Sequence, residues 1–331
     1  MNPEYKAVKD IIEQSEKIIL TTHVVPDGDA IGSVIAFADY LKLQGKDPVI
    51  INHSHTPDNL KFLDKDNSIK VFGSDIGENS KLIEEADLII ILDTNEYART
   101  KSMGPYIANS KAKKACIDHH TGINAELYDA FISNINYPSN CSILCDYIKD
   151  DDANYLTKNI ASALYVGIMT DTGSFRHPRT DASVFRMCAD LVERGADPVS
   201  LYESIYATTT MPNLKLMGKF IDSLEFFYDN KVVTGFVTQE DFRLLGLNID
   251  HVEGFSGMIM NILGIKVGIV LVELKDNIKI SFRSKGEIDV STLAKKFEGG
   301  GHKNASGANV KNVPMNELKD KILEELKNYL N

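Results

Sequence analysis

The chain has 331 residues and a formal net charge of −11, and 43% of its residues are hydrophobic and 25% charged. These proportions indicate a globular protein long enough for two domains, and they exclude a disordered, collagen-like or disulfide-framework chain. The excess of acidic residues argues against a long nucleic acid as partner, because that needs a basic surface.

In chain order, short apolar runs alternate with helical patterns over the first half of the sequence. Strands are predicted at 18–20, 48–51, 69–72, 88–92 and 115–117, and helices at 30–44, 141–149, 158–169 and 181–194. Strands that alternate with helices and consist mainly of Ile, Leu and Val are typical of a parallel sheet with helices on both faces. Residues 1–194 are therefore predicted to form an α/β domain.

The pattern changes after residue 194. Residues 195–215 are predicted to be a linker, and residues 216–331 a smaller α+β domain. Its expected strands are 232–238, 267–274 and 278–282, and its expected helices are 251–263, 289–297 and a charged C-terminal helix. A turn is expected at the glycine run 299–301.

Cysteine content and hydropathy bear on the location of the protein. The four cysteines are predicted to be reduced core residues: Cys116, Cys141, Cys145 and Cys188. The longest aliphatic run, 88–92, is far shorter than a membrane span. A cytoplasmic location without a membrane partner is expected.

Three predicted strands end in histidine or aspartate, at the sheet edge where α/β proteins bind ligands. The first is followed by His23, Asp27 and Asp29. Imidazole and carboxylate groups together suit Mn²⁺, Fe²⁺, Co²⁺ or Zn²⁺ better than Ca²⁺, and two alternate carboxylates could serve two ions. Alternatively, Asp29 could only cap the helix that follows.

Two further strand ends and one helix end carry similar groups. Asp93 follows an aliphatic strand, where its carboxylate could bridge two cations or simply form a turn. One of the adjacent His119 and His120 can bind metal while the other faces a substrate. Asp118 could orient a metal-binding histidine, and Asp171 adds a carboxylate after a helix.

These segments resemble the motifs of the DHH phosphoesterase superfamily, which is named for the triplet Asp118-His119-His120. The motifs occur in order as HVVPDGDAIGS, the strand end at Asp93, IDHH and MTDTGSF, and GGGHKNASG resembles the signature of the DHH-associated C-terminal domain. The length and the two-domain layout are most similar to the nanoRNase/pAp phosphatase subgroup. The resemblance implies an active site in a cleft between the two domains.

The resemblance also implies roles for individual residues. One metal would be held by His23, Asp27 and Asp93, and the other by Asp29, Asp93, His119 and Asp171. Asp118 would lie behind the metal ligands, and His120 would contact the phosphate or the leaving group. Arg99, directly after the Asp93 segment, is expected to hold a substrate phosphate rather than form a surface ion pair. The implied substrate contacts of the second domain are Arg283, Gly300, Gly301 and His302, although a glycine run can also simply stop a helix.

The activity implied is metal-dependent hydrolysis of short oligoribonucleotides or linear dinucleotides to mononucleotides. Hydrolysis of 3′-phosphoadenosine 5′-phosphate (pAp) to AMP and phosphate is expected as well. Two Mn²⁺ ions per site are expected, with Mg²⁺ or Co²⁺ as alternatives, and a homodimer is the default oligomer. The alternatives are a cyclic-dinucleotide phosphodiesterase, a pyrophosphatase-like hydrolase and a non-catalytic nucleotide-binding sensor.

Overall fold

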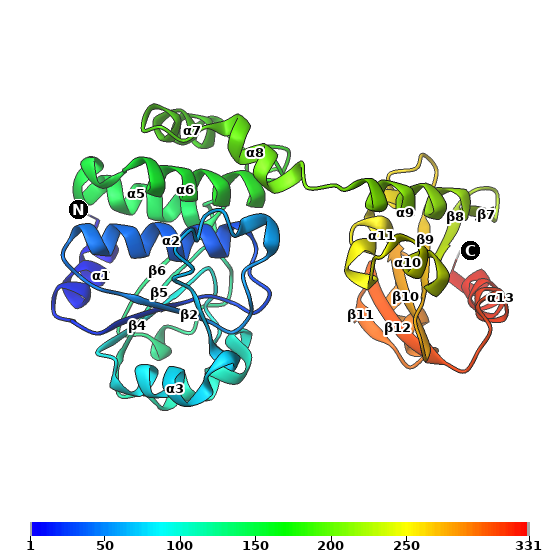
Figure 1. Cartoon of the computed structure of the whole chain (residues 1–331), viewed down its shortest axis with the longest axis horizontal. Helices are drawn as coiled ribbons and strands as arrows, with labels where there is room; N and C mark the ends of the chain where they lie inside the picture. The colour runs from blue at the N-terminus through cyan, green and yellow to red at the C-terminus, as the bar shows by residue number, and fades with distance from the viewer. Residues whose placement is uncertain (1, 330–331) are drawn as a thin grey trace. The chain divides into compact units, whose positions relative to one another are not determined.

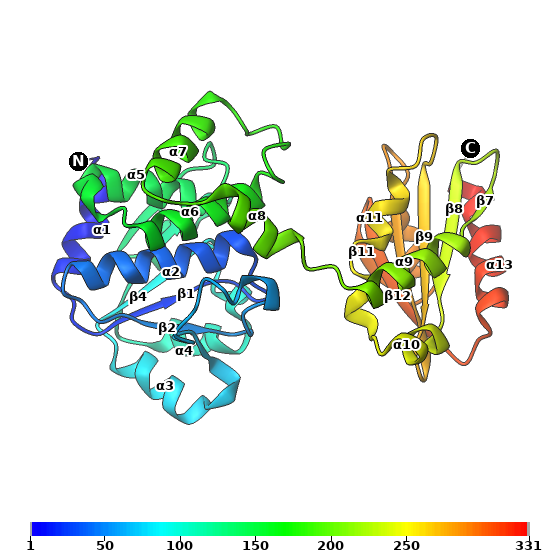
Figure 2. The same cartoon turned by 45° about the horizontal axis from the view of Figure 1, so that its top comes forward.

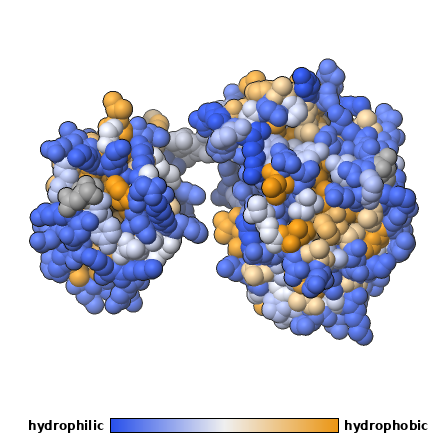
Figure 3. Space-filling view, turned by 180° about the vertical axis from the view of Figure 1, so that it is seen from behind, coloured by the Kyte–Doolittle hydropathy of each residue, from blue (hydrophilic) through white to orange (hydrophobic). Residues whose placement is uncertain are grey.

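The computed structural model describes residues 2–329. The chain divides into two compact units, with the boundary between Thr208 and Thr209; Figure 1 shows their elements. All four cysteines are buried and free, as predicted. Within the described residues, none of the helices has both the length and the apolar character needed to cross a membrane. On the face drawn in Figure 3 both units are mostly hydrophilic, with apolar side chains in small groups.

Unit 1 is built on a six-stranded sheet in the order β3-β2-β1-β4-β5-β6, and every neighbouring pair is parallel. The strands are β1 (Ile18–Thr21), β2 (Val49–Asn52), β3 (Lys70–Val71), β4 (Leu88–Leu92), β5 (Lys113–Asp118) and β6 (Ala130–Ser133). The first five were predicted; β6 was not, and its strand character comes from its parallel pairing with β5.

Helices cover both faces of this sheet, as predicted. Figures 1 and 2 show α2, α5 and α6 on one face and α3 on the other. The helices of unit 1 are α1 (Pro3–Glu13), α2 (Gly28–Leu43), α3 (Ile76–Glu85), α4 (Gly104–Asn109), α5 (Asn140–Asp152), α6 (Lys158–Asp171), α7 (Ala182–Glu193) and α8 (Pro198–Tyr206). Two apolar cores result, because successive strand residues point to opposite faces: Ile18 and Leu20 join one core and Ile19 the other.

The order of the strands determines where the functional side chains lie. β1, β4 and β5 are adjacent and parallel, so their carboxyl ends reach the same edge of the sheet. All five residues of β4 are buried. The polar residues that follow these three strands are therefore brought together at the edge of a rigid, apolar layer.

Unit 2 contains a six-stranded sheet in the order β11-β12-β10-β9-β8-β7, in which only β8 and β9 are parallel. Its strands are β7 (Glu225–Phe227), β8 (Val232–Val237), β9 (Val267–Glu273), β10 (Asn277–Ser284), β11 (Gly300–His302) and β12 (Ala305–Lys311). Its helices are α9 (Met211–Asp222), α10 (Gln239–Leu245), α11 (Phe255–Met260), α12 (Val290–Lys295) and α13 (Met315–Leu326). One face packs on α12 and α13, and the other on α9, α10 and α11.

Two local predictions for unit 2 are wrong. The helix expected at 251–263 is only α11, because Gly254, with a φ of +86°, separates it from a short 3₁₀ turn at 249–252. The turn expected at the glycine run is instead the edge strand β11, which pairs with β12. The segment 195–215, predicted as a linker, contains α8 and the first residues of α9.

Candidate active site

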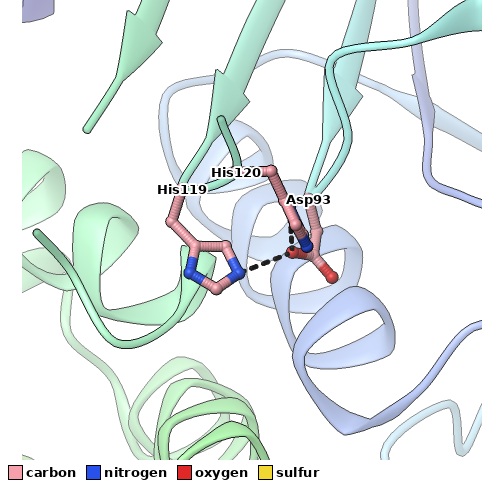
Figure 4. A group of neighbouring side chains, drawn as sticks. All are labelled: Asp93, His119 and His120. Carbon is pink, nitrogen blue, oxygen red and sulfur yellow. Dashed lines mark ion pairs between the residues drawn. The ribbon is translucent and has the colours of Figure 1, made fainter. Parts of the chain in front are cut away.

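Asp93 lies at the centre of the polar cluster, directly after β4. Its side chain is buried, and its φ of +59° lies in the left-handed region, which costs a residue other than glycine about 1–2 kcal/mol. Its Oδ2 lies 3.3 Å from Nε2 of His23, and its Oδ1 lies 3.4 Å from Nε2 of His119. Figure 4 shows Asp93 beside His119 and His120. One carboxylate therefore faces an imidazole on each side.

His119 connects Asp93 to two more carboxylates. Its Nε2 lies 3.5 Å from Oδ2 of Asp171 and 3.8 Å from Oδ2 of Asp29. Its other ring nitrogen, Nδ1, lies 3.3 Å from the carbonyl oxygen of Tyr137. A backbone carbonyl behind one nitrogen fixes the ring and leaves the other free to bind a metal.

Three groups of side chains could each hold a metal ion. In every group, one ligand atom from each of three residues lies within 4.8 Å of the others. The groups are His23, Asp27 and Asp93; Asp29, His119 and Asp171; and Asp93, His119 and His120. All six residues predicted as metal ligands from the sequence fall in these groups, together with His120.

The backbone holds the two carboxylates of the first loop in different ways. Asp29 is buried, and its Oδ2 and Oδ1 accept hydrogen bonds from the amides of Asn140 (2.6 Å) and Cys141 (2.8 Å) at the start of α5. Asp27 is the N-cap of α2, and its Oδ1 accepts the amide hydrogens of Asp29 and Ala30. The cap is thus Asp27, and the alternative that Asp29 serves as the cap is wrong.

The close packing of these groups shifts their pKa values. Burial opposes the charged form of His119, but Asp93, Asp29 and Asp171 outweigh it and raise the pKa of His119 to about 9. Burial, with the nearby Asp93 and Asp171, raises the pKa of Asp29 well above its usual range. Burial acts in the same direction on Asp93, yet the imidazoles of His119 and His23 lower its pKa. These shifts favour the ionised form of Asp93 and the protonated form of His119. A cation that binds Nε2 of His119 would displace its proton.

The side chains present fit divalent cations. Oδ1 of Asp93 is buried and accepts no hydrogen bond from the described residues, and such an atom is costly unless a cation or donor reaches it. Imidazole and carboxylate donors are the mixture that suits Mn²⁺, Fe²⁺, Co²⁺ and Zn²⁺. Cations would also relieve the repulsion among the clustered carboxylates.

His120 differs from His119 in its partners and its exposure. Its Nδ1 lies 2.7 Å from Oδ1 of Asp118, and 40% of its side chain is exposed. Asp118 is fully buried, and its Oδ2 accepts a hydrogen bond of 2.7 Å from Nδ2 of Asn95. Asn95 was not singled out from the sequence, although its place two residues after Asp93 is a polar strand end of the same kind.

Arg99 lies in the loop after β4, in a 3₁₀ segment from Tyr97 to Met103. Its carbonyl oxygen accepts the amide hydrogen of Val24, at 2.7 Å, which ties this loop to the one that carries His23. Its half-buried guanidinium has no hydrogen bond or ion pair with the residues that the structure describes. The surface ion pair considered as an alternative is therefore absent from that part of the chain.

The residues predicted to contact substrate in unit 2 lie around one residue of β12. Ala305 is opposite Arg283 on one side and His302 on the other, so both side chains lie on one face of the sheet. Gly301 has a φ of +139°, and a Cβ there would lie 2.6 Å from the carbonyl oxygen of Ala305. A Cβ at Gly300 would meet nothing within 4 Å. The backbone conformation and the close approach of Ala305 thus require glycine at 301, whereas the space beside Gly300 is open.

Family models match both units of the chain. The model described as DHH family, N-terminal domain, matches residues 17–168, and the DHHA1 domain model matches residues 215–331. The chain belongs to the DHH phosphoesterase family. The resemblance inferred from the motifs is thereby confirmed, and so is the enzyme class, phosphoester hydrolase.

Curated DHH relatives resemble the chain over most of its length. The bifunctional oligoribonuclease and PAP phosphatase NrnA of Thermus thermophilus is 26% identical, covering 98% of this chain and 94% of the relative. The protein of the same name from Bacillus subtilis is 28% identical, covering 89% and 90%. The crystal structure of an exopolyphosphatase-related protein from Bacteroides fragilis matches with a TM-score of 0.86 and 29% identity, covering 99% of this chain and 97% of that one.

Proposed function

We propose that this DHH phosphoesterase hydrolyses short oligoribonucleotides and linear dinucleotides to mononucleotides, and pAp to AMP and phosphate. The proposal rests chiefly on the metal-ligand groups that share Asp93 and His119 at the ends of adjacent strands. The NrnA relatives, which match along nearly their whole length, supply the substrate class.

The two cations of this proposal are Mn²⁺ ions. His23, Asp27 and Asp93 would hold one, and Asp29, Asp93, His119 and Asp171 the other. When bound, such a pair supplies Lewis-acid catalysis, which neutralises charge on the phosphate and lowers the pKa of the attacking water. The protein positions the ligands, because backbone groups hold Asp29 and His119 in place without substrate.

His120 has the position of a proton-transfer group in this account. The buried carboxylate of Asp118 holds its Nδ1, which leaves Nε2 of the half-exposed ring available to the substrate. A positioned imidazole of this kind can donate a proton to the leaving oxygen, which typically contributes 10²- to 10⁴-fold to a rate. Arg99 would add a positive charge for the phosphate, because its guanidinium forms no ion pair with the described residues.

In unit 2, Arg283 and His302 would contact the nucleotide. They share one face beside Ala305, and a guanidinium with an adjacent glycine backbone suits phosphate and sugar groups. This assignment is tested by substitution of either residue, which should raise KM for nucleotides more than it lowers kcat.

The direct test is an incubation of the purified protein with Mn²⁺ and five substrates: pApA, a five-nucleotide RNA, pAp, cyclic di-AMP and pyrophosphate. Release of mononucleotides from the two linear RNAs and of phosphate from pAp, all abolished by a chelator, is the expected result. Turnover of only cyclic di-AMP or pyrophosphate would support the proposed metal centre but reject the proposed substrates. Recovery of every nucleotide unchanged would indicate a binding protein instead of an enzyme.

A further inference from the structure

A cavity of about 310 Å³ lies beside the metal-ligand cluster, entirely within unit 1. His119 and Asp171 contribute to its wall, so it borders the candidate metal centre directly. The remaining wall comes mainly from Pro138 and from the segment that follows Asp171, including His177 and Arg179. None of the substrate contacts predicted from the sequence lines this space.

The segment after Asp171 is held in one conformation that returns it toward the cluster. Ser174 and Phe175 have φ values of +55° and +66°, which are strained for residues with side chains. The amide of Ser174 donates to the carbonyl of Met169 at 2.8 Å, and the hydroxyl of Thr172 donates to the carbonyl of Ile168 at 2.7 Å. These bonds hold the turn in this conformation.

His177 completes this turn. Its amide donates to the carbonyl of Thr172 at 3.0 Å, and its Nδ1 lies 3.0 Å from the carbonyl oxygen of Asp171. The ring lies against Gly173, where an added Cβ would come within 2.4 Å of Nε2. The chain from His177 to Arg179 is therefore anchored to the same turn that carries Asp171.

Arg179 reaches the backbone group that orients a candidate metal ligand. Its Nη1 lies 3.5 Å from the carbonyl oxygen of Tyr137, and Nδ1 of His119 lies 3.3 Å from the same oxygen. The guanidinium is exposed and has no ion pair with any residue described by the structure. The guanidinium of Arg179 and the imidazole of His119 thus approach the same carbonyl oxygen.

The charge of the cluster suggests what this guanidinium could bind. The aspartates at 27, 29, 93, 118 and 171 carry five negative charges when ionised, and two divalent cations would supply four positive ones. A substrate with a second phosphate needs further positive charge close to the phosphate whose bond is broken. Guanidinium groups bind phosphate strongly through paired N–H groups.

We propose that Arg179 binds a second, non-scissile phosphate of the substrate in this cavity, with Pro138 and Pro178 against the sugar. The inference rests on the proposed function and makes it more specific. The preferred substrates are nucleotides with an additional terminal phosphate, such as 5′-phosphorylated dinucleotides, over the same dinucleotides without it.

The test compares pApA with ApA, which differ only in the terminal phosphate, in Mn²⁺. The wild-type protein should prefer pApA. Arg179→Met should lower kcat/KM for pApA at least tenfold, as expected for loss of a hydrogen bond between charged groups, and change that for ApA less than twofold. Arg179→Lys should retain part of the preference. Arg194→Met, which removes an exposed arginine at the end of α7, should behave as wild type.

Each other outcome overturns a defined part of the account. Equal losses on pApA and ApA would show that Arg179 acts through Tyr137 and His119, and reduced Mn²⁺ content of the variant would confirm it. Wild-type rates for Arg179→Met on both substrates would exclude the contact. If wild-type protein hydrolyses neither substrate, nor pAp, the proposed function itself fails.

Discussion

Nδ1 of His120 lies 2.7 Å from Oδ1 of the fully buried Asp118. Asp118 lies outside the three metal-ligand groups, and Asn95 occupies its other oxygen. Among the described histidines, Asp118 therefore contacts only His120, which also belongs to the group with Asp93 and His119. The relationship also refines the sequence interpretation, in which Asp118 could orient a metal-binding histidine.

Asp118→Asn should reduce kcat for pAp by about 10²- to 10⁴-fold, the range of a lost proton-transfer group. An amide cannot hold the ring and stabilise its charged form as a carboxylate does. His120→Gln should give a similar loss, and the double variant should be little worse than either, because the residues act as a unit. Steady-state kinetics and Mn²⁺ content measured together test this, and loss of Mn²⁺ from Asp118→Asn would contradict it.

The metal-free protein should lose stability as the pH rises from about 6.5 to about 9. His119 has a pKa raised to about 9 in the folded chain against a reference value of 6.5, so its stabilising contribution is complete below 6.5 and lost above 9. Mn²⁺ requires the neutral imidazole, so its affinity should rise over the same window. Thermal unfolding with chelator and with Mn²⁺ measures both trends.

The matched variants for this pH dependence are His119→Gln and His55→Gln. The first should flatten the fall in Tm of the chelated protein, and the second, which changes an exposed loop histidine, should leave it unchanged. An identical pH profile in all three proteins would show that His119 does not carry the effect.

Gly167→Ala should destabilise the protein by about 1–3 kcal/mol, the usual cost of overpacking, and weaken Mn²⁺ binding. A Cβ at Gly167 would lie 2.2 Å from Sγ of Cys141 and 2.7 Å from Oδ1 of Asp29, so α6 would have to move away from a metal ligand. Gly218→Ala is the control, because a Cβ there meets nothing within 4 Å. Urea unfolding and Mn²⁺ titration should separate the variants, and equal effects would refute the packing argument.

The fold of unit 1 could be predicted because its strands are continuous aliphatic runs between helical patterns. Leu88–Leu92 was predicted at the bounds that β4 has in the structure. Unit 2 was harder, since β11 and β12 consist largely of small and polar residues whose strand character comes from pairing. The edge strand at Gly300–His302 forms through its bonds to β12, which no local pattern in a glycine run reveals.

The candidate ligands could be found because each one lies close to the end of a strand or helix, and parallel neighbouring strands bring their carboxyl ends to one edge of the sheet. What the sequence could not provide were the contacts between distant segments. The amides of Asn140 and Cys141 that hold Asp29 belong to a helix more than a hundred residues further along the chain. The cavity lined by Arg179 likewise depends on the turn at 173–175, whose left-handed residues have no sequence signature beyond Gly173.

The most direct test of the account is the Mn²⁺ stoichiometry and pAp turnover of Asp93→Asn, measured beside wild type and Asp66→Asn, an exposed aspartate in a loop. Asp93 should be shared by two cations, so its variant should bind fewer than two Mn²⁺ per chain and lose about 10³-fold or more in kcat, while remaining folded. Asp66→Asn should retain two ions and full turnover. An Asp93→Asn protein that still binds two Mn²⁺ and hydrolyses pAp at the wild-type rate would contradict the account.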